Sequence, residues 1–198
     1  MRIISAFTAL LFVPAIAFAA VEPGKPAPAF TAKDIAGVEH SIAGHKGKII
    51  VLEWHNEGCP FVVKHYDSKN MQGLQSAAVK DGVVWLTVNS SAEGKQGYAT
   101  PDEAKAIAAA AKAAPAAIVL DASGEIGRAY DARTTPHMFV IDGAGTLVYA
   151  GAIDDKPTAD AADIPGATNY VLAALEDVKN GRPVATPESE PYGCSVKY

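Results

Sequence analysis

Three short runs of β-branched and aromatic residues recur along the chain, with helix-like segments between them. The runs are IIVLEW (49–54), VVWLTVN (83–89) and AIVLD (117–121). Continuous apolar runs of this length are typical of strands that are covered on both faces of a sheet. Because these strands alternate with helices, the pattern predicts an α/β fold with a central sheet flanked by helices.

Two further segments indicate hairpins. HMFVIDGAGTLVYAGAI (137–153) has a strand-like run on each side of a glycine-rich turn. Residues 30–48 alternate polar and apolar side chains around two glycine-containing turns, which predicts an N-terminal hairpin that covers part of the domain. A late hairpin added to alternating strands and helices makes the central sheet mixed.

Helical patterns lie between the strand patterns. The clearest start is Thr100-Pro101-Asp102-Glu103, where threonine is a good N-cap, proline suits the first helical position and glutamate can complete a capping box. Within the longest helical pattern, residues 60–80, Gly73 is the position that favours a helix least. Helices are expected over residues 60–80, 102–114, 124–130 and 168–180.

The first twenty residues, MRIISAFTALLFVPAIAFAA, have a different composition. Arg2 precedes an apolar stretch, and Ala17-Phe18-Ala19 offers the small residues of a cleavage site. This pattern predicts a signal peptide over residues 1–19, followed by one domain over 20–183 and a C-terminal tail over 184–198. We therefore expect an exported protein, periplasmic in a Gram-negative host, with no membrane attachment after cleavage.

Charge and composition exclude some partners. The formal net charge is −5 and no run of lysine or arginine appears, so no nucleic-acid partner is expected. Gly94-Lys95-Gln96-Gly97 lacks the spacing of a phosphate-binding loop, and we expect no nucleotide or other cofactor.

Cys59 is one of two cysteines, and it stands between Gly58 and Pro60 where a strand gives way to a helix. A thiol just before the first helical turn faces the positive end of the helix dipole, which stabilises the reactive thiolate. The alternative is a buried cysteine that only fills space. His55 follows the strand and could lie within reach of the sulfur as its base; the alternative is a solvated loop histidine. Lys64 and His65 turn away from the sulfur on a helix that begins at Pro60.

The order of elements, the Cys59-Pro60 pair after IIVLEW and the stretch TTPHMFVIDGAGTLVYAG (134–151) together resemble the thioredoxin-like redoxins. Within them the chain is similar to the peroxiredoxin-like alkyl hydroperoxide reductase/thiol-specific antioxidant family, over residues 22–180. The resemblance implies a thioredoxin-like fold with Cys59 as the redox-active thiol. It also implies that Thr135 and a cis Pro136 form a platform for an extended substrate backbone, although most X–Pro bonds are trans.

The sequence departs from this family's patterns at several positions. Val62 and Asn56, three residues after and before the thiol, rule out Cys-x-x-Cys in either register. Leu52 and Asn56 replace the proline and the threonine or serine of the peroxiredoxin signature. Asn56 could donate a hydrogen bond to substrate in their place. Pro136 aligns with the arginine that polarises peroxide, which leaves Arg133 as the nearest substitute.

Cys194 lies four residues from Tyr198, in a segment whose sequence indicates a loose tail. An oxidised Cys59 needs a second thiol to resolve it, and a cysteine on a tail can swing in to do so. We therefore predict a Cys59–Cys194 disulfide, within one chain or across a dimer. The sequence leaves the oligomeric state open.

The favoured function is an exported thiol oxidoreductase that reduces peroxides or exchanges disulfides with partner proteins. A thiol reductant then returns its cysteines to the reduced state. One alternative is a copper-binding protein that uses Cys59, Cys194 and one of His55, His65 and His137. Another is a non-catalytic module whose single disulfide ties down the tail. No metal is expected for the favoured function.

Overall fold

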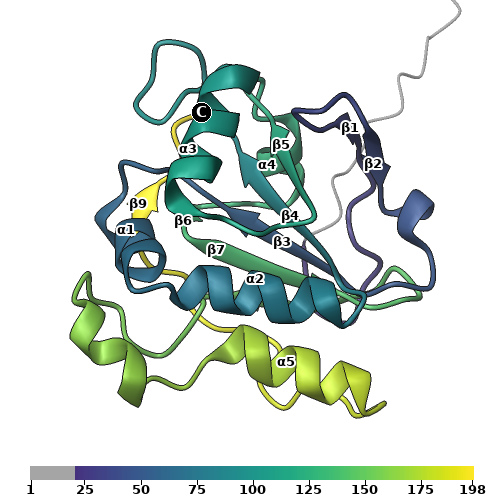
Figure 1. Ribbon diagram of the computed structural model, residues 1–198. Helices are drawn as coiled ribbons and strands as arrows, with labels where there is room; N and C mark the ends of the chain where they lie inside the picture. The colour runs from purple at the N-terminus through teal and green to yellow at the C-terminus, as the bar shows by residue number, and fades with distance from the viewer. Residues whose placement is uncertain (1–20) are drawn as a thin grey trace, which may run out of the picture.

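Residues 21–198, the part of the chain that the computed structural model describes, form a five-stranded mixed sheet at the centre of the molecule (Figure 1). The strand order is β5-β4-β3-β7-β8, with β3, β4 and β5 parallel and β7 and β8 antiparallel to their neighbours. The predicted signal peptide lies outside the described residues. The strands are β3 (Ile50–Trp54), β4 (Val84–Asn89), β5 (Ala117–Leu120), β7 (His137–Ile141) and β8 (Leu147–Gly151).

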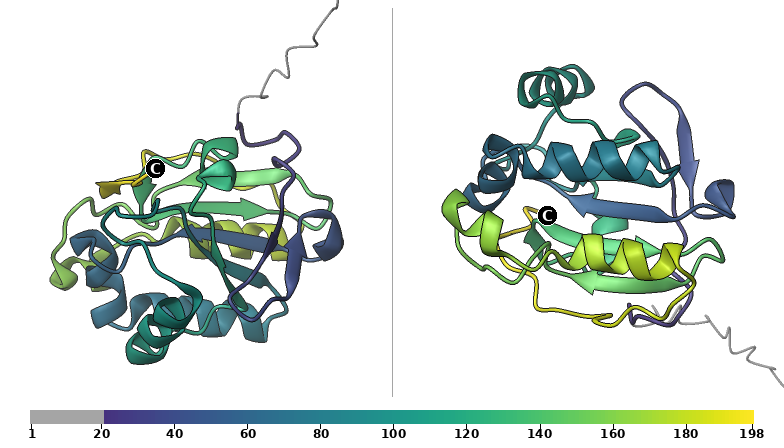
Figure 2. Two further views of the ribbon diagram at one scale, coloured as in Figure 1. Left: turned by 90° about the horizontal axis from the view of Figure 1, so that it is seen from above. Right: turned by 60° about the horizontal axis from the view of Figure 1, so that its bottom comes forward.

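Helices cover both faces of this sheet, as the alternating pattern predicts. Figures 1 and 2 show α2 and α5 side by side across one face, where they pack with α1 on Val51, Trp85 and Val140. The other face holds Trp54 and Phe139 against α4 and the N-terminal segment. The helices are α1 (Pro60–Asp67), α2 (Asn70–Lys80), α3 (Pro101–Ala111), α4 (Glu125–Ala129) and α5 (Tyr170–Lys179), with 3₁₀ turns η1 (Ala43–His45) and η2 (Ala161–Gly166).

The expected helix over residues 60–80 is in fact two helices, and the break is not at Gly73. Lys69, with φ of 66°, adopts the left-handed conformation between α1 and α2. The Ser68 hydroxyl donates to the Lys64 carbonyl and so satisfies the end of α1. Gly73 lies inside α2, so the prediction of a single helix was wrong because local capping outweighed the continuous apolar pattern.

The N-terminal hairpin and the cap of α3 follow the predictions. β1 (Thr31–Lys33) and β2 (Glu39–Ser41) pair antiparallel. Thr100 accepts a hydrogen bond from the Glu103 N–H, and the Glu103 carboxylate accepts one from the Thr100 N–H, so the capping box is complete.

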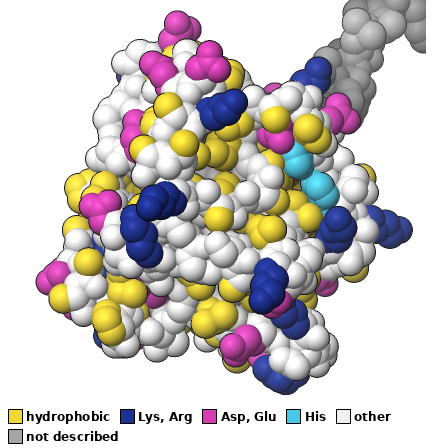
Figure 3. All heavy atoms as spheres, viewed as in Figure 1, with side chains coloured by type: hydrophobic (Ala, Val, Ile, Leu, Met, Phe, Trp, Pro, Cys, Tyr) yellow, Lys and Arg dark blue, Asp and Glu magenta, His cyan; other side chains and the backbone are white. Residues whose placement is uncertain are grey.

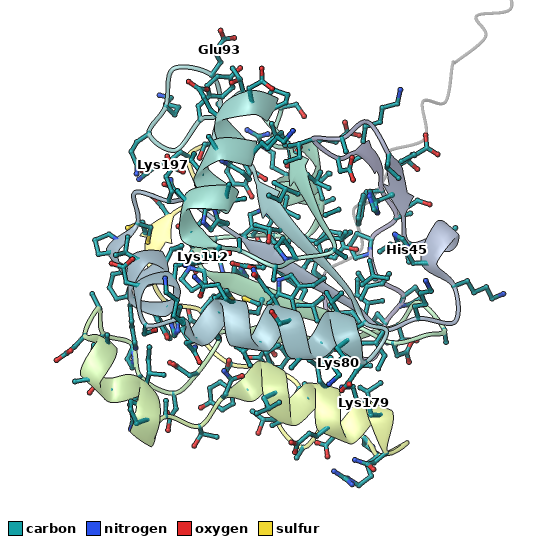
Figure 4. The ribbon with its side chains drawn as sticks, in the orientation of Figure 1. His45, Lys80, Glu93, Lys112, Lys179 and Lys197 are labelled. Atoms are coloured by element: carbon teal, nitrogen blue, oxygen red, sulfur yellow. The ribbon has the colours of Figure 1, made fainter. Side chains whose placement is uncertain are left out.

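The C-terminal segment is ordered against the domain, so the expectation of a loose tail was wrong. After α5 the chain follows β8, where the Ala150 N–H donates to the Pro187 carbonyl. Its last strand, β9 (Cys194–Ser195), pairs antiparallel with β6 (Thr134–Thr135) and lies beside α1 (Figure 1). The Ala92 N–H donates to the Lys197 carbonyl, which places Lys197 near the loop that carries Glu93 (Figure 4). Long-range backbone pairing fixes this segment, and no local periodicity reveals such pairing.

The surface seen in Figure 3 carries basic and acidic side chains interspersed, with hydrophobic atoms between them. In Figure 4, Lys179 of α5 lies near the end of α2, and its ammonium pairs with Asp81 at 2.6 Å. Within residues 21–198, no helix is both long enough and apolar enough to cross a membrane.

Candidate active site

Cys59 is the N-cap residue of α1, as the sequence predicts. Its φ and ψ of −85° and 121° are extended, and Pro60 occupies the first helical position. The side chain is 0% exposed. Its Sγ donates a hydrogen bond of 2.9 Å to the Thr135 carbonyl, which lies 76 residues further along the chain. The fold thus joins the two segments that carried the family resemblance.

The Thr135–Pro136 peptide bond is cis, as the resemblance implies. Thr135 is buried, and its carbonyl faces Cys59 while its backbone belongs to β6. The strand opposite is β9, in which Cys194 is the direct partner of Thr135. Cys59, Thr135 and Cys194 therefore meet at one point, although they come from three distant parts of the sequence.

Both thiols are free, and Cys194 packs against the buried cluster that contains Cys59. Burial, the largest single influence, raises the pKa of Cys59. The polar groups of Cys194, Thr135 and Val62 around the sulfur outweigh it, so the pKa lies below the ordinary value of a thiol. Burial and the neighbouring Cys59 raise the pKa of Cys194 to about 11. The arrangement favours a thiolate at Cys59 and a protonated Cys194.

Asn56 holds the turn that leads into α1. Both hydrogens of its side-chain amide are donated to Gln96, to the backbone carbonyl at 3.2 Å and to Oε1 at 3.0 Å. Its Oδ1 accepts from the Gly58 N–H and from Gln96 Nε2. A Cβ on Gly58 would lie 2.1 Å from Gln96 Nε2, so a side chain there would displace the Gln96 amide from Asn56. Asn56 is thus a positioning residue whose amide hydrogens are already committed within the protein.

The sequence reasoning missed Gln96. It found that residues 94–97 do not form a phosphate-binding loop and assigned them no other role. No local signal identifies it, because its partner Asn56 lies 40 residues away.

Arg133 lies close to the site in sequence, but its side chain points elsewhere. Its Nη1 pairs with Glu190 of the tail at 3.5 Å, and the side chain is half exposed. Its backbone N–H donates to His137 Nδ1 at 3.2 Å, and its carbonyl accepts from the Val196 N–H. These contacts connect Arg133 to the tail rather than to the Cys59 sulfur.

The candidate histidines have separate surroundings. His55 packs edge-on against Tyr66, with ring centroids 5.1 Å apart, in an apolar pocket beneath α3, and burial lowers its pKa. It lies in the loop after β3, as one expectation had it, but it is partly buried rather than fully solvated. His65 is buried and contacts Asn70 and Tyr192, which agrees with its turning away from the sulfur.

The copper alternative requires several ligands around one ion. Residues 21–198 contain no cluster of three or more histidine, cysteine, aspartate or glutamate side chains placed to hold a metal ion. The two cysteines therefore have no third ligand of these types beside them within that range.

Glu53 is a second residue that the sequence reasoning missed. It lies in the middle of β3 and is 1% exposed. A charged residue inside the apolar run IIVLEW was the signal that could have identified it. Its carboxylate accepts four hydrogen bonds, from Tyr66, Gln75, Trp85 and Thr87.

The parallel and antiparallel strand order, the cis proline step and the helix-capping cysteine define a thioredoxin-like redoxin. The chain belongs to the AhpC/TSA family, whose model matches residues 23–150. It is 28% identical over 135 residues to the thiol-disulfide oxidoreductase ResA of Geobacillus kaustophilus strain HTA426, which covers 65% of this chain and 68% of that relative.

Solved structures show the same fold. An uncharacterized conserved protein from Geobacillus kaustophilus superimposes with a TM-score of 0.75 at 26% identity, covering 90% of this chain and 93% of its own. The thioredoxin domain of a thiol-disulfide oxidoreductase from Bacteroides vulgatus gives a TM-score of 0.53 at 20% identity over 74% of this chain and 97% of its own. These comparisons confirm the predicted fold, and the family and ResA confirm the predicted class, a thiol oxidoreductase of the redoxin type.

Proposed function

We propose that this protein is an exported thiol-disulfide oxidoreductase in which Cys59 and Cys194 form one redox couple. The observation that supports it most directly is the pairing of β9 with β6, which sets Cys194 opposite Thr135, the residue whose carbonyl accepts a hydrogen bond from the Cys59 thiol. A thiol pair at a helix N-terminus, with one pKa lowered and the other raised, is suited to attack followed by resolution.

The reaction has two exchange steps. The Cys59 thiolate attacks one sulfur of a disulfide in a partner protein, forms a mixed disulfide and releases the other sulfur as a thiolate. That thiolate takes up the proton of Cys194, whose sulfur then attacks Cys59. The Cys59–Cys194 disulfide forms, and the partner leaves with both sulfurs reduced. A dithiol reductant returns the pair to its free state, with its own thiols oxidised to a disulfide.

Two residues that could bind or polarise a peroxide substrate are engaged in other contacts. The amide hydrogens of Asn56 are donated to Gln96, and the guanidinium of Arg133 pairs with Glu190. Disulfide exchange is therefore the favoured reaction over peroxide reduction. In this proposal Thr135 and Pro136 contact the substrate backbone, Asn56 positions Gly58, and Arg133 holds the tail.

Export is part of the same proposal. Residues 1–19 act as a signal peptide, residues 20–183 form the redox domain and residues 184–198 form the tail that carries Cys194. An exported location supports the chemistry, since oxidising compartments permit a disulfide to persist between turnovers.

The decisive test is intact mass after oxidation of the fully reduced protein, in parallel with one equivalent of a peptide disulfide and one of hydrogen peroxide. We expect the peptide disulfide to convert the protein to a form that has lost two hydrogens. The Cys194→Ser variant should accumulate a mixed disulfide on Cys59, and Cys59→Ser should not react. If peroxide reacts rapidly and the peptide disulfide does not, the activity is a peroxidase; if both thiols stay free with either oxidant, the redox proposal fails.

A separate control distinguishes the non-catalytic alternative. A disulfide that only ties down the tail predicts that Cys59→Ser lowers stability without removing any activity. Measuring urea unfolding and exchange rate on the same Cys59→Ser sample separates these two effects.

A further inference from the structure

The tail that brings Cys194 to Cys59 also covers the edge of β6. Within the described part of the chain, β6 pairs with no strand except β9. Thr134 faces Ser195 and Thr135 faces Cys194, and the Val196 N–H extends the pairing to the Arg133 carbonyl at 3.0 Å. A strand edge that a short terminal segment covers can pair with another extended chain when that segment leaves.

The register of this pairing decides which side chain meets the thiol. Cys59 Sγ bonds to the carbonyl of Thr135, and the residue opposite Thr135 is Cys194. Any extended segment in the same register would present the side chain at that position to Cys59. The tail therefore occupies the place of a peptide that delivers a sulfur atom to the reactive thiol.

The same tail closes the site. Cys59 is 0% exposed, so an external protein chain cannot contact its sulfur while β9 is in place. Gly193 makes this close packing possible: its φ is 132°, and a Cβ there would lie 2.1 Å from the Thr135 carbonyl oxygen. Only glycine at this position lets the tail approach β6 so closely.

Two tyrosines hold the ends of the covering segment. At one end the Tyr192 hydroxyl donates to Asp154, and its ring packs against Phe61 with centroids 5.8 Å apart. At the other end the Tyr198 hydroxyl donates to the Ala132 carbonyl at 2.7 Å, and Arg128 lies 4.5 Å from the ring centroid. While both cysteines are free, these contacts and the backbone pairing are non-covalent, so the segment can be displaced without breaking a covalent bond.

The resemblance already assigns this edge to the substrate backbone, and we propose that residues 192–198 are its resident occupant, a covering strand that competes with an extended, cysteine-containing segment of a partner protein. The partner segment pairs antiparallel to β6 with its cysteine opposite Thr135. The inference rests on the proposed function in taking Cys59 as the thiol to be reached. It adds that Cys194 returns on the strand that displaces the partner, so that resolution and product release are one movement.

Binding can be tested without redox chemistry. The probe is a fluorescent peptide of residues 190–198 carrying Cys194→Ser, and the proteins are Cys59→Ser chains of full length or truncated after Pro191. We expect saturable binding to the truncated chain. The full-length chain should bind about 100-fold more weakly, because its own tail competes at a high effective concentration. The matched control peptide also carries Gly193→Ala, and its added methyl group should abolish binding.

The outcomes are separable. A folded truncated chain that does not bind the probe, or a full-length chain that binds it equally well, overturns the inference. If truncation prevents folding, full-length Gly193→Ala replaces it, since the methyl group should expel the tail; no gain in probe binding by that variant likewise overturns the inference. Loss of exchange activity in the native protein with probe binding retained contradicts only the proposed function.

Discussion

At the scale of single residues, the two thiols differ in how easily they lose a proton. Donor groups of Cys194, Thr135 and Val62 around the Cys59 sulfur lower its pKa. Donors of this kind stabilise a thiolate against the cost of burial. Cys194, in contrast, donates to its neighbour and has a raised pKa. The direction of exchange is therefore set by the immediate surroundings of each sulfur.

This asymmetry predicts an effect of Cys194→Ala on the titration of Cys59. In the reduced native protein, thiolate absorbance near 240 nm should rise with pH through a midpoint below the ordinary cysteine value of about 8.5. Removing the Cys194 thiol takes away one donor to the thiolate, so the midpoint should move up and the rate of attack on a disulfide at neutral pH should fall. Cys194→Ser keeps a hydroxyl donor at that place and should titrate near the native midpoint. Equal midpoints for the alanine and serine variants would contradict this assignment.

Asn56 provides a second prediction at this scale. Asn56→Ala removes the acceptor for the Gly58 N–H and the reciprocal pair with Gln96, and should lower the free energy of unfolding by about 2 kcal/mol. Urea unfolding followed by circular dichroism measures the loss. Gln96→Ala is the matched variant, and the double substitution should cost less than the two single costs added, since both remove the same contact. Strict additivity would show that the two amides act independently.

At the scale of elements, Glu53 joins strands and helices on the buried face where Cys59 lies. Its carboxylate, on β3, accepts from Tyr66 of α1, Gln75 of α2, and Trp85 and Thr87 of β4. A buried carboxylate is tolerable only with such a full set of donors. One side chain thereby fixes two helices relative to two strands.

Glu53→Leu should therefore destabilise the domain far more than a surface substitution does. Leucine has similar bulk but leaves four buried donors without an acceptor, and we expect a loss of about 4 kcal/mol in the free energy of unfolding. Glu53→Gln keeps one acceptor oxygen and should lose less. Thermal and urea unfolding of both variants measure this order, and a leucine variant as stable as the native protein would show that the donors find other partners.

At the scale of the whole molecule, oxidation joins the tail to the domain. Cys59 and Cys194 lie near opposite ends of the described chain, so a disulfide between them closes a very long loop. In the chain-entropy model such a bond stabilises the folded state by about 5 kcal/mol relative to the reduced protein.

Oxidised protein should therefore unfold at a higher guanidinium concentration than reduced protein, with a larger difference than any surface change gives. Cys194→Ser is the control and should unfold at the same concentration under both conditions. If the native protein also shows no difference, the two thiols do not join within one chain.

The fold could largely be predicted from sequence because its signals are local. The runs 49–54, 83–89 and 117–121 became β3, β4 and β5, and residues 137–153 became the β7–β8 hairpin. The cap of α3 and the place of Cys59 at the start of α1 depend on neighbours within a few residues. Where local cues competed, as at Lys69 against Gly73, the pattern alone chose the wrong residue.

By itself the sequence determined the order of strands and helices, the redoxin class and the position of Cys59 at a helix N-terminus. The tertiary structure decided what surrounds that thiol: the Thr135 carbonyl, the Asn56–Gln96 pair and the tail that carries Cys194. The physical reason is range. Propensity, capping and periodicity act between residues close in the chain, whereas hydrogen bonds between strands such as β6 and β9 depend on where the fold brings distant backbones together.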